Sequence, residues 1–563
     1  MSLPPALEEQ CAAKKAEQLS KIPKDWLIDS PAHDTLSVID FPSTCTDILN
    51  DKEIEITELD DIDELLGRLA KGVWGAEEVT RAYCKRAIIA HQLTNCLTEF
   101  WIEDAISQAR RLDEIRLEIG PVGPLHGLPV SLKDQFDVAG TENNMGLASW
   151  LGRKCKDDAA LVTILRKSGA VIFARTNVPM AIMMPETVNQ QVHPSKIPND
   201  NVYGRTVNPR NRNLTSGGSS GGEAALLALK GSPLGVGTDL GGSIRNPACL
   251  NALYGLKPST RRMPYWGACN TLVGQESIES SVGPLSRTLS GCATFFKTIL
   301  QGQPWNLDPK VLEMPWRETM FNLEHLGGNK AKMCFAFMED DGLVRCQPPV
   351  RRAMREAVEA VRQAGHTVIP WNPVDHQHAI SILQRTFASD SGEEFKILFG
   401  ESGEPLLPGI DDVSAFPPIT VNAFWRLCTE REAYRKQYLD AWLASASLTS
   451  TGRPIDAIIC PVAPFPPPTH GNYIYAGYTC VWNVLDLPSV AIPVTVVDQV
   501  LDQPEADYKP RNEMDAKVYE MYKSPELFRN GPVGIQVISR RWHEEECLGL
   551  ARIVDEALKQ RKT

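Results

Sequence analysis

The chain has 563 residues, of which 43% are hydrophobic and 23% are charged, as in an ordinary globular protein. Its formal net charge of −12 argues against a nucleic acid or an anionic membrane as the main partner. No apolar run approaches the ~20 residues that cross a membrane, and no segment has the pattern of a signal peptide. The fourteen cysteines contain no C-x-x-C pair and no metal-site spacing. We therefore expect reduced thiols in a cytoplasmic protein that needs no metal and no cofactor.

The first part of the chain is charged and contains prolines, and a helical pattern covers residues 6–21. We expect residues 1–58 to form an N-terminal helical arm. Residues 59–563 are expected to form one large domain, because no internal repeat and no Gly/Ser-rich linker divides them. Apolar residues recur at helical spacing over residues 61–71 and 76–91, which predicts two helices before a strand that begins near residue 95.

A buried strand is predicted over residues 128–132, and it ends at Lys133. A helix over residues 157–168 and a strand over residues 170–175 follow, which gives the β-α-β alternation of an α/β fold. Asp134 stands next to the lysine. Neighbouring side chains of a strand point to opposite faces, so we do not expect Asp134 to pair with Lys133.

The most unusual stretch of the chain runs from Ser216 to Pro247, and it holds nine glycines in the 26 residues that begin at Gly217. Average usage would give about two. Two clusters of glycine and serine, residues 217–222 and 241–243, flank a predicted short helix with Glu223 at its N-terminal end and a stop near Gly231. Loops of this composition occur where main-chain N–H groups point at a ligand.

Three common glycine-rich motifs do not fit this stretch. Glu223 follows the last glycine of the first cluster, where a phosphate-binding loop needs lysine and then serine or threonine. Leu240 stands where the dinucleotide-binding fingerprint needs its third glycine. A nucleophile elbow around Ser220 must follow a strand, whereas residues 208–216 have the pattern of a polar loop.

The second half of the chain alternates predicted strands and helices. Strands are expected over residues 332–339, 367–371, 456–461, 486–493 and 531–539, and helices over residues 349–364, 379–399, 420–446 and 544–560. Residues 300–330 and the charged segment 498–524 are expected on the surface. The whole chain is thus predicted to be an α/β protein.

The glycine-rich stretch resembles the signature block of the amidase signature family of serine hydrolases, with Ser219 and Ser243 at the family's separation of 24 positions. The segment GLPVSLKD, which ends at Asp134, is similar to the family's lysine motif, and the segment TNVP that begins at Thr176 also matches. The resemblance covers roughly residues 60–555 and is to the fungal or eukaryotic type, similar to acetamidases and fatty-acid amide hydrolase. It implies a single large α/β/α domain whose mixed, twisted sheet is covered by helices on both faces.

Amide hydrolysis needs an activated nucleophile, an oxyanion hole and a proton for the nitrogen leaving group. Ser243 has the better setting for the nucleophile, because it follows residues whose N–H groups could face a developing oxyanion. By the resemblance, Ser243 attacks, Ser219 on a cis peptide bond moves the proton, and Lys133 is the final base and acid. The resemblance assigns the oxyanion hole to the amides of Leu240, Gly241, Gly242 and Ser243.

Lysine acts as a base only when it is neutral, and at its ordinary pKa of ~10.4 only about one molecule in 2,500 is neutral at pH 7. Lowering the pKa of Lys133 to ~8 costs the charged form ~3 kcal/mol, which burial among hydroxyl groups could supply. No histidine lies in either motif. His193, in an apparent extra loop over residues 190–200, is therefore only a reserve candidate, and we expect that loop to tune substrate choice.

Other residues are expected to support these groups. The segment after Pro179 should line the pocket, so Ile182 and Met183, together with Ser219, are predicted to bind the substrate. Ser220, Asp239 and Arg245 are expected to hold the catalytic loops, with Arg245 acting through Asp239 or backbone carbonyls.

The leading expectation is an amidase that hydrolyses the C–N bond of a linear carboxamide, a small-molecule substrate, through an acyl-enzyme. Acyl transfer to an amine by the same intermediate, a subunit of an amidotransferase, and an inactive amidase-like binding scaffold remain as alternatives. The sequence leaves monomer and homodimer open.

Overall fold

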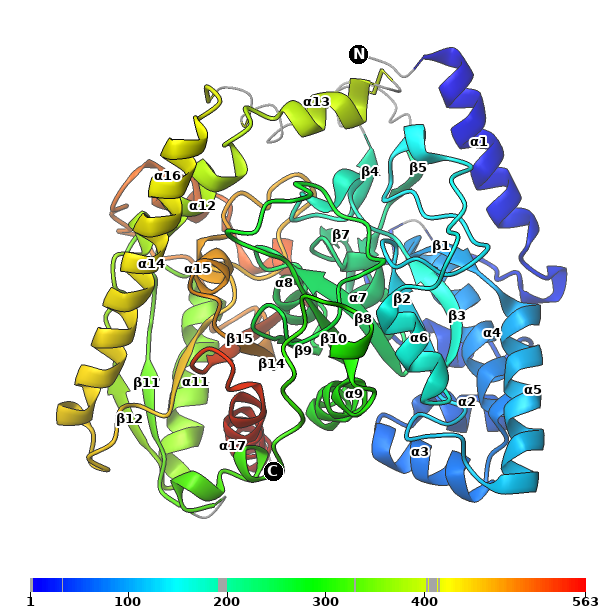
Figure 1. Ribbon diagram of the computed structural model, residues 1–563, viewed down its shortest axis with the longest axis horizontal. Helices are drawn as coiled ribbons and strands as arrows, with labels where there is room; N and C mark the ends of the chain where they lie inside the picture. Colours follow the sequence, from blue (N-terminus) through cyan, green and yellow to red (C-terminus); the bar gives the residue numbers. More distant parts are fainter. Residues whose placement is uncertain are drawn as a thin grey trace.

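The computed structural model describes residues 4–32, 34–190, 200–328, 331–400, 403–404, 413 and 416–562. At its centre lies one sheet of eleven strands in the order β1-β3-β2-β8-β10-β9-β14-β15-β13-β11-β12 (Figure 1). These strands are β1 (Leu97–Phe100), β2 (Pro129–Lys133), β3 (Val171–Thr176), β8 (Leu234–Asp239), β9 (Tyr254–Lys257), β10 (Ser281–Ser286), β11 (Cys334–Phe337), β12 (Thr367–Pro370), β13 (Ala457–Pro461), β14 (Ser489–Val496) and β15 (Pro532–Ile538). Strands β3, β2 and β8 are parallel, as are β13, β11 and β12, and the strands between these groups are antiparallel. The expected α/β class with one mixed sheet is confirmed.

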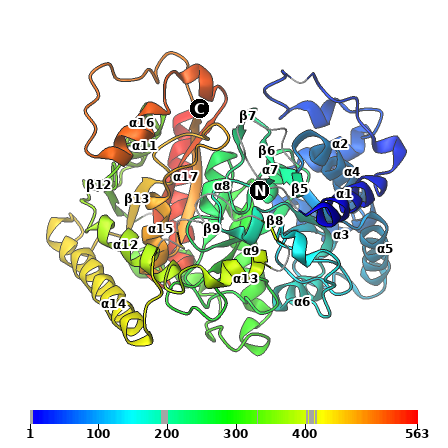
Figure 2. The ribbon, with the colours of Figure 1, turned by 90° about the horizontal axis from the view of Figure 1, so that it is seen from above.

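Helices cover this sheet and continue beyond its ends. They are α1 (Pro5–Ser20), α2 (Asp51–Glu58), α3 (Ile62–Lys71), α4 (Ala76–Thr94), α5 (Ile102–Ile119), α6 (Ala160–Lys167), α7 (Gly221–Ala228), α8 (Arg245–Leu250), α9 (Leu289–Gln301), α10 (Glu318–Phe321), α11 (Pro348–Gln363), α12 (His376–Phe387), α13 (Glu393–Gly400), α14 (Val421–Ala444), α15 (Gly477–Leu485), α16 (Glu513–Glu520) and α17 (Glu544–Lys562). The peripheral helices α1 and α14 lie at opposite ends of the molecule in both views (Figures 1 and 2).

The two faces of the sheet are covered by different helices. Strand β14 demonstrates this, because Ala491 packs with residues of α7 and α8, whereas its neighbours Val490 and Ile492 join the core that includes α9, α11 and α17. Successive side chains of a strand point to opposite faces, so α7 and α8 lie on one face of β14 and α9, α11 and α17 lie on the other. The loops that carry Ser219 and Ser243 adjoin α7 and α8.

The N-terminal region packs against the large domain. Trp26, Leu49 and Ile56 are buried in the same hydrophobic cluster as residues of α4, such as Val79. A boundary at residue 58 stays a prediction. The helices predicted near residues 6–21, 61–71 and 76–91 are present as α1, α3 and α4.

Two expectations from the sequence are wrong in detail. Residues 379–399 do not form one helix, because α12 and α13 are separated by a turn in which Ser391 and Gly392 have φ of 60° and 69°. The stretch before the first serine cluster is not a plain loop, because β6 (Val207–Asn208) and β7 (Asn211–Thr215) form a small hairpin outside the main sheet. Polar composition hid this hairpin, since its strands lack the alternation of a half-buried sheet.

The fourteen cysteines are all free. Within the described ranges, no helix is long and apolar enough to cross a membrane. In the same ranges, no group of three or more histidine, cysteine, aspartate or glutamate side chains could hold a metal ion.

Candidate active site

The predicted catalytic residues meet at one edge of the sheet. Lys133 ends β2 and Asp239 ends β8, and these two strands are parallel neighbours with Leu132 opposite Val236. The loop with Ser243 directly follows β8, and the loop with Ser219 directly precedes α7, which packs on β8. The carboxyl ends of parallel strands lie at the same edge, so this topology brings distant parts of the chain together.

The Lys133 side chain is fully buried among hydroxyl and carbonyl oxygens. Its Nζ lies 2.7 Å from Ser219 Oγ, 2.8 Å from Thr238 Oγ1 and 3.5 Å from the Thr238 carbonyl oxygen. Burial lowers the pKa of Lys133 to about 7, although the charges of Asp239 and Glu223 act in the opposite direction. A substantial fraction of this lysine is therefore neutral near pH 7, as a general base requires.

Ser219 is buried, and a cis peptide bond joins it to Gly218. The residue before it must be glycine for a steric reason. A Cβ on Gly218 would lie 2.7 Å from the Met184 carbonyl oxygen and 2.8 Å from the Glu186 amide nitrogen, and both are backbone atoms that cannot move aside cheaply. The first glycine cluster thus allows the Ser219 hydroxyl to reach Lys133 by close backbone packing.

Ser243 is the partly exposed member of the three residues, whereas Ser219 and Lys133 are buried. Its carbonyl oxygen accepts a hydrogen bond of 3.2 Å from the Ser220 amide, which ties the two serine loops together. Within the part of the chain that the structure describes, Ser243 Oγ has no hydrogen-bond partner. The hydroxyl groups of Ser243 and Ser219 are therefore not hydrogen-bonded to each other in this geometry. Such contacts often tighten only when a substrate is bound.

The loop before Ser243 leaves several amides free. Gly242 donates its N–H to Asp239 Oδ1 at 2.8 Å, and Ile244 donates its N–H to Asp239 Oδ2 at 3.1 Å. The Leu240, Gly241 and Ser243 amides donate no hydrogen bond to any described residue. The Gly242 amide thus donates to a carboxylate in this geometry, whereas the other three amides make no such bond. The oxyanion hole of Leu240, Gly241, Gly242 and Ser243 stays a prediction.

Asp239 and Arg245 form a fully buried ion pair below this loop. The Arg245 guanidinium donates to both carboxylate oxygens of Asp239, at 2.9 and 3.0 Å. Burial alone would raise the pKa of Asp239, but Arg245 holds it well below its usual range. Arg245 also donates to the Thr479 carbonyl oxygen at 3.1 Å and to Asn483 Oδ1 at 2.7 Å. The sequence-based expectation that Arg245 contacts Asp239 and a backbone carbonyl agrees with these bonds.

Helix α15 supports the same loop from the far end of the chain, which the sequence did not indicate. Thr479 Oγ1 donates to the Gly241 carbonyl oxygen at 2.7 Å, and Asn483 Nδ2 donates to Asp239 Oδ1 at 2.9 Å. These contacts span more than 230 positions of sequence. No local pattern reports a contact over such a separation.

Glu223 belongs to the buried centre rather than to an exposed helix end. Its carboxyl group is fully buried and accepts hydrogen bonds from Ser131 Oγ at 2.7 Å and from Thr176 Oγ1 at 3.1 Å. Burial raises the pKa of Glu223 to about 8. Its position between two glycine-rich clusters was a signal for burial, because loops that pack closely leave little room for water.

Asp134 and Ser220 complete the neighbourhood. The Asp134 carboxylate lies 3.6 Å from the Arg175 guanidinium, so its ion pair is with Arg175. Strand geometry led us to expect only that Asp134 would not pair with Lys133. Ser220 Oγ is buried without a hydrogen-bond partner among the described residues, and it lies where a Cβ on Gly237 would approach to 2.8 Å. The Ser220 side chain therefore packs against β8.

The predicted pocket wall follows β3 and packs in a small hydrophobic cluster. Ile182 is buried in it, Met183 packs against it, and the neighbouring Ala181 and Ile182 both have positive φ, of 55° and 54°. A β-branched residue with positive φ is a genuine conformational outlier, and such outliers gather at functional sites. Strands β4 (Val188–Gln190) and β5 (Asp200–Arg205) pair just beyond this wall. Residues 191–199, with the reserve candidate His193, lie outside the described residues.

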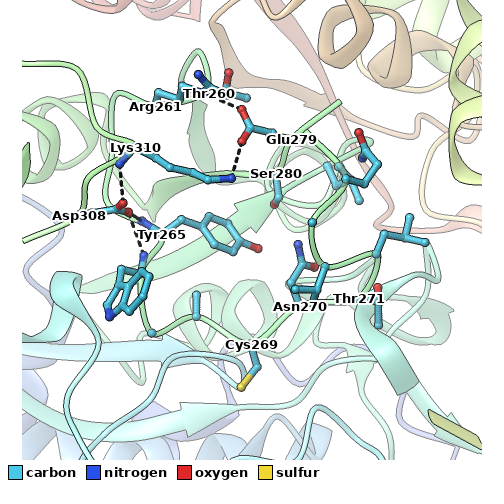
Figure 3. Close-up of a pocket in the computed structure, with 18 of the residues that line it drawn as sticks. Thr260, Arg261, Tyr265, Cys269, Asn270, Thr271, Glu279, Ser280, Asp308 and Lys310 are labelled. Carbon is cyan, nitrogen blue, oxygen red and sulfur yellow. Dashed lines mark hydrogen bonds and ion pairs between the residues drawn. The ribbon is translucent and has the colours of Figure 1, made fainter. Parts of the chain in front are cut away.

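A cavity of about 440 Å³ lies beside the loop that carries Ser243 (Figure 3). Leu240 of that loop lines it, together with a segment that includes Tyr265, Cys269 and Ser280. Figure 3 shows the Tyr265 ring between the Lys310–Glu279 ion pair and Cys269. Ser243, Ile182 and Met183 do not line this cavity. The segment between β9 and β10 was not singled out from the sequence.

The comparison with known proteins now decides the family. The family model described as Amidase matches residues 78–548. The chain belongs to the amidase family. It is 42% identical to an acetamidase of Aspergillus oryzae over 560 residues, which cover 99% of this chain and 100% of the relative. It is 41% identical to an acetamidase of Emericella nidulans, over 99% of both chains.

A solved structure gives the same result for this amidase family member. Fatty acid amide hydrolase superposes with a TM-score of 0.89 at 29% identity, over 99% of this chain and 96% of that one. The resemblance inferred from the serine clusters and the lysine motif is therefore confirmed. Family membership and these relatives support amide hydrolysis as the activity.

Proposed function

We propose that the protein hydrolyses linear carboxamides through an acyl-enzyme formed on Ser243, with Ser219 and Lys133 as its proton-transfer partners. The observation that supports this proposal best is the 2.7 Å contact between Lys133 Nζ and Ser219 Oγ inside a fully buried site. A buried lysine that contacts only hydroxyl and carbonyl oxygens, with its pKa lowered to about 7, is suited to proton transfer.

In the first step, Ser243 Oγ attacks the amide carbon while its proton passes to Ser219 Oγ and the Ser219 proton passes to neutral Lys133. The carbonyl oxygen becomes an oxyanion, which the amides of Leu240, Gly241 and Ser243 would stabilise. The C–N bond then breaks as the proton returns through Ser219 to the leaving nitrogen. The products of this half-reaction are an ester on Ser243 and an amine or ammonia.

In the second step, water attacks the ester carbon and gives its proton to the same pair. Breakage of the Ser243 ester bond returns that proton to Ser243 Oγ and releases the carboxylic acid. Lys133 therefore acts as base and then as acid in each half-reaction. Asp239 and Arg245 would hold the loop by their buried ion pair, and Ile182 and Met183 would form part of the substrate-binding wall.

The decisive test is Ser243→Ala, assayed with acetamide, because the relatives are acetamidases, and with a bulkier anilide. We expect activity to fall by about 10⁴-fold or more, with thermal stability unchanged. Ser220→Ala is the matched control, since it removes a hydroxyl that has no described partner, and it should stay active. If Ser243→Ala kept more than a few per cent of the wild-type activity, the assignment of Ser243 as the nucleophile would be wrong. Added hydroxylamine would reveal acyl transfer as a hydroxamate product, and a fluorophosphonate that failed to label the wild type would favour an inactive scaffold.

A further inference from the structure

Gln135 stands two residues after Lys133, is fully buried, and has no part in the chemistry proposed above. Its side chain lies between Thr238, which contacts the lysine, and the cavity segment. We propose that Gln135 is a positioning residue that fixes the direction of the hydrogen bonds around Lys133, so that the lone pair of the neutral amine faces Ser219. This inference rests on the proposed function.

The orientation of the Gln135 amide is determined by Cys269. Gln135 Nε2 lies 2.8 Å from the Cys269 carbonyl oxygen, which can only accept a hydrogen bond. The amide nitrogen must therefore face Cys269, and it also donates to the Tyr265 hydroxyl oxygen at 3.0 Å. The main chain holds the same neighbour, because the Cys269 N–H donates to the Gln135 carbonyl oxygen at 2.7 Å. The side-chain oxygen of Gln135 is left facing Thr238.

The direction of the next bond follows. Thr238 Oγ1 lies 2.6 Å from Gln135 Oε1, and an amide oxygen cannot donate. The single hydroxyl hydrogen of Thr238 must therefore lie on this bond. Thr238 Oγ1 can then offer only a lone pair to Lys133, so the 2.8 Å bond between them is donated by the lysine.

The geometry around Lys133 is completed by its other contacts. A neutral amine has two N–H groups and one lone pair. The two N–H groups are directed at Thr238 Oγ1 and at the Thr238 carbonyl oxygen, 3.5 Å away. The remaining direction holds Ser219 Oγ at 2.7 Å, so the lone pair accepts the Ser219 hydroxyl hydrogen. When Lys133 is protonated, the same three contacts serve three N–H groups, and only the Lys133–Ser219 bond changes its direction.

Loss of the Gln135 oxygen removes this constraint. In Gln135→Met the Thr238 hydroxyl is free to turn and donate to the Lys133 lone pair, where it competes with Ser219. The competition lowers the fraction of lysine that is ready to accept the proton. Gln135 does not itself line the cavity, although its amide donates to Tyr265 and Cys269, which do. We therefore expect kcat to fall about tenfold, as for one misdirected hydrogen bond, and KM to change less than about twofold.

A double-mutant cycle separates this effect from a structural one. Thr238→Val removes the hydroxyl through which Gln135 acts, so Gln135→Met should change kcat less than about twofold in that background. Thr238→Ser is the matched control, because it keeps the hydroxyl and should retain most of kcat. A loss from Gln135→Met that is as large in the Thr238→Val background as in the wild type would overturn the proposal.

The pH profile supplies a second readout. The proposed effect lowers the plateau of kcat without moving its acid limb to higher pH, because a hydrogen bond donated to the lone pair favours neutral lysine. Loosening of the site would admit water and move the limb toward the ordinary lysine pKa, which would contradict our inference.

The same assays distinguish this inference from the proposed function. Residual turnover in Ser243→Ala would show that the proposed catalytic scheme is wrong, whatever the Gln135 variants show. If Ser243→Ala is inactive but the effects of the Gln135 and Thr238 substitutions are additive, the catalytic scheme stands. Only the proposed role of Gln135 would then be wrong.

Discussion

Two buried titratable residues of opposite kind, Lys133 and Glu223, influence each other's charge. Burial lowers the pKa of Lys133 to about 7 and raises that of Glu223 to about 8, so both groups approach neutrality near pH 7. A charge on Glu223 favours the charged form of Lys133, and the reverse also holds. Their ionisation is therefore coupled. A pH–rate profile would report apparent pKa values of the pair rather than of either residue.

The first prediction concerns Lys133. Because only neutral lysine can accept a proton, kcat/KM for acetamide should rise with pH through about 7 and reach a plateau on the alkaline side. Lys133→Met should lower kcat by more than about 10³-fold at the plateau, since the lysine also protonates the leaving group. The check is a pH–rate profile from pH 5 to 10. A full rate at pH 5 would contradict a neutral lysine base.

The second prediction concerns Glu223. Gln resembles the neutral carboxyl group in shape, so Glu223→Gln should keep at least about a third of kcat at pH 7. Removal of the negative charge that develops near pH 8 makes protonated Lys133 less favourable, so the acid limb of the profile should move to lower pH. Glu223→Ala serves as the comparison and should be much less stable, because it removes the buried acceptor of the Ser131 and Thr176 hydroxyl groups. A limb that moved to higher pH would show that Glu223 does not act on Lys133 by charge.

At the scale of elements, the sequence predicted best where a local pattern and a packed strand coincide. Strand β2 ends at Lys133 as predicted, because a run of apolar residues followed by a lysine marks the end of a buried strand. The support that α15 gives to the glycine loop was not predictable, since its contacts span more than 230 positions of sequence. The hydrogen-bond network of Gln135 was equally hidden, because its partners Thr238 and Cys269 lie more than a hundred positions away.

The third prediction tests α15. Thr479→Val keeps the shape of the side chain but removes the hydroxyl that donates to the Gly241 carbonyl oxygen. The backbone amides of the loop would then be less firmly positioned to stabilise the oxyanion. We therefore expect kcat to fall about tenfold with little change in KM. Thr479→Ser keeps the hydroxyl and should stay near the wild-type rate. The prediction is checked by steady-state kinetics of the wild type and the two variants. Equal rates for Thr479→Val and Thr479→Ser would show that the Thr479 hydroxyl does not support the loop.

At the scale of the whole molecule, the N-terminal helix α1 protects an edge of the sheet. Gln18 Nε2 donates to the carbonyl oxygens of Leu97 and Thr98 in the edge strand β1, at 2.8 Å each. Lys14 Nζ lies 2.9 Å from Glu142 and 3.4 Å from Glu99. An uncovered edge strand offers unpaired backbone groups to other chains, so a covering helix also guards against aggregation.

The arm is also connected to the pocket wall. Cys11 of α1 packs in one cluster with Ala148 and Tyr203, and the Tyr203 hydroxyl accepts a hydrogen bond of 2.9 Å from Asn144. Met145, which follows Asn144, is buried in the cluster that contains Ile182. The expected helical arm thus contacts the large domain next to residues that support the predicted substrate-binding wall. Its composition alone gave a helix but not this position, because only the fold brings β1 and residues 144–148 beside it.

The last prediction is that deletion of residues 1–21 weakens both the fold and the site. Removal of α1 exposes the β1 edge and the cluster around Tyr203, so Tm should fall by about 3 °C or more and aggregation on heating should increase. KM for the bulkier anilide should rise more than KM for acetamide, because the wall around Ile182 loses support while the Lys133–Ser219 contact lies elsewhere. Gln18→Leu removes only the two bonds to β1 and should lower Tm less than the deletion. Scanning calorimetry and kinetics with both amides make the check, and an unchanged Tm would mean that the arm does not stabilise the domain.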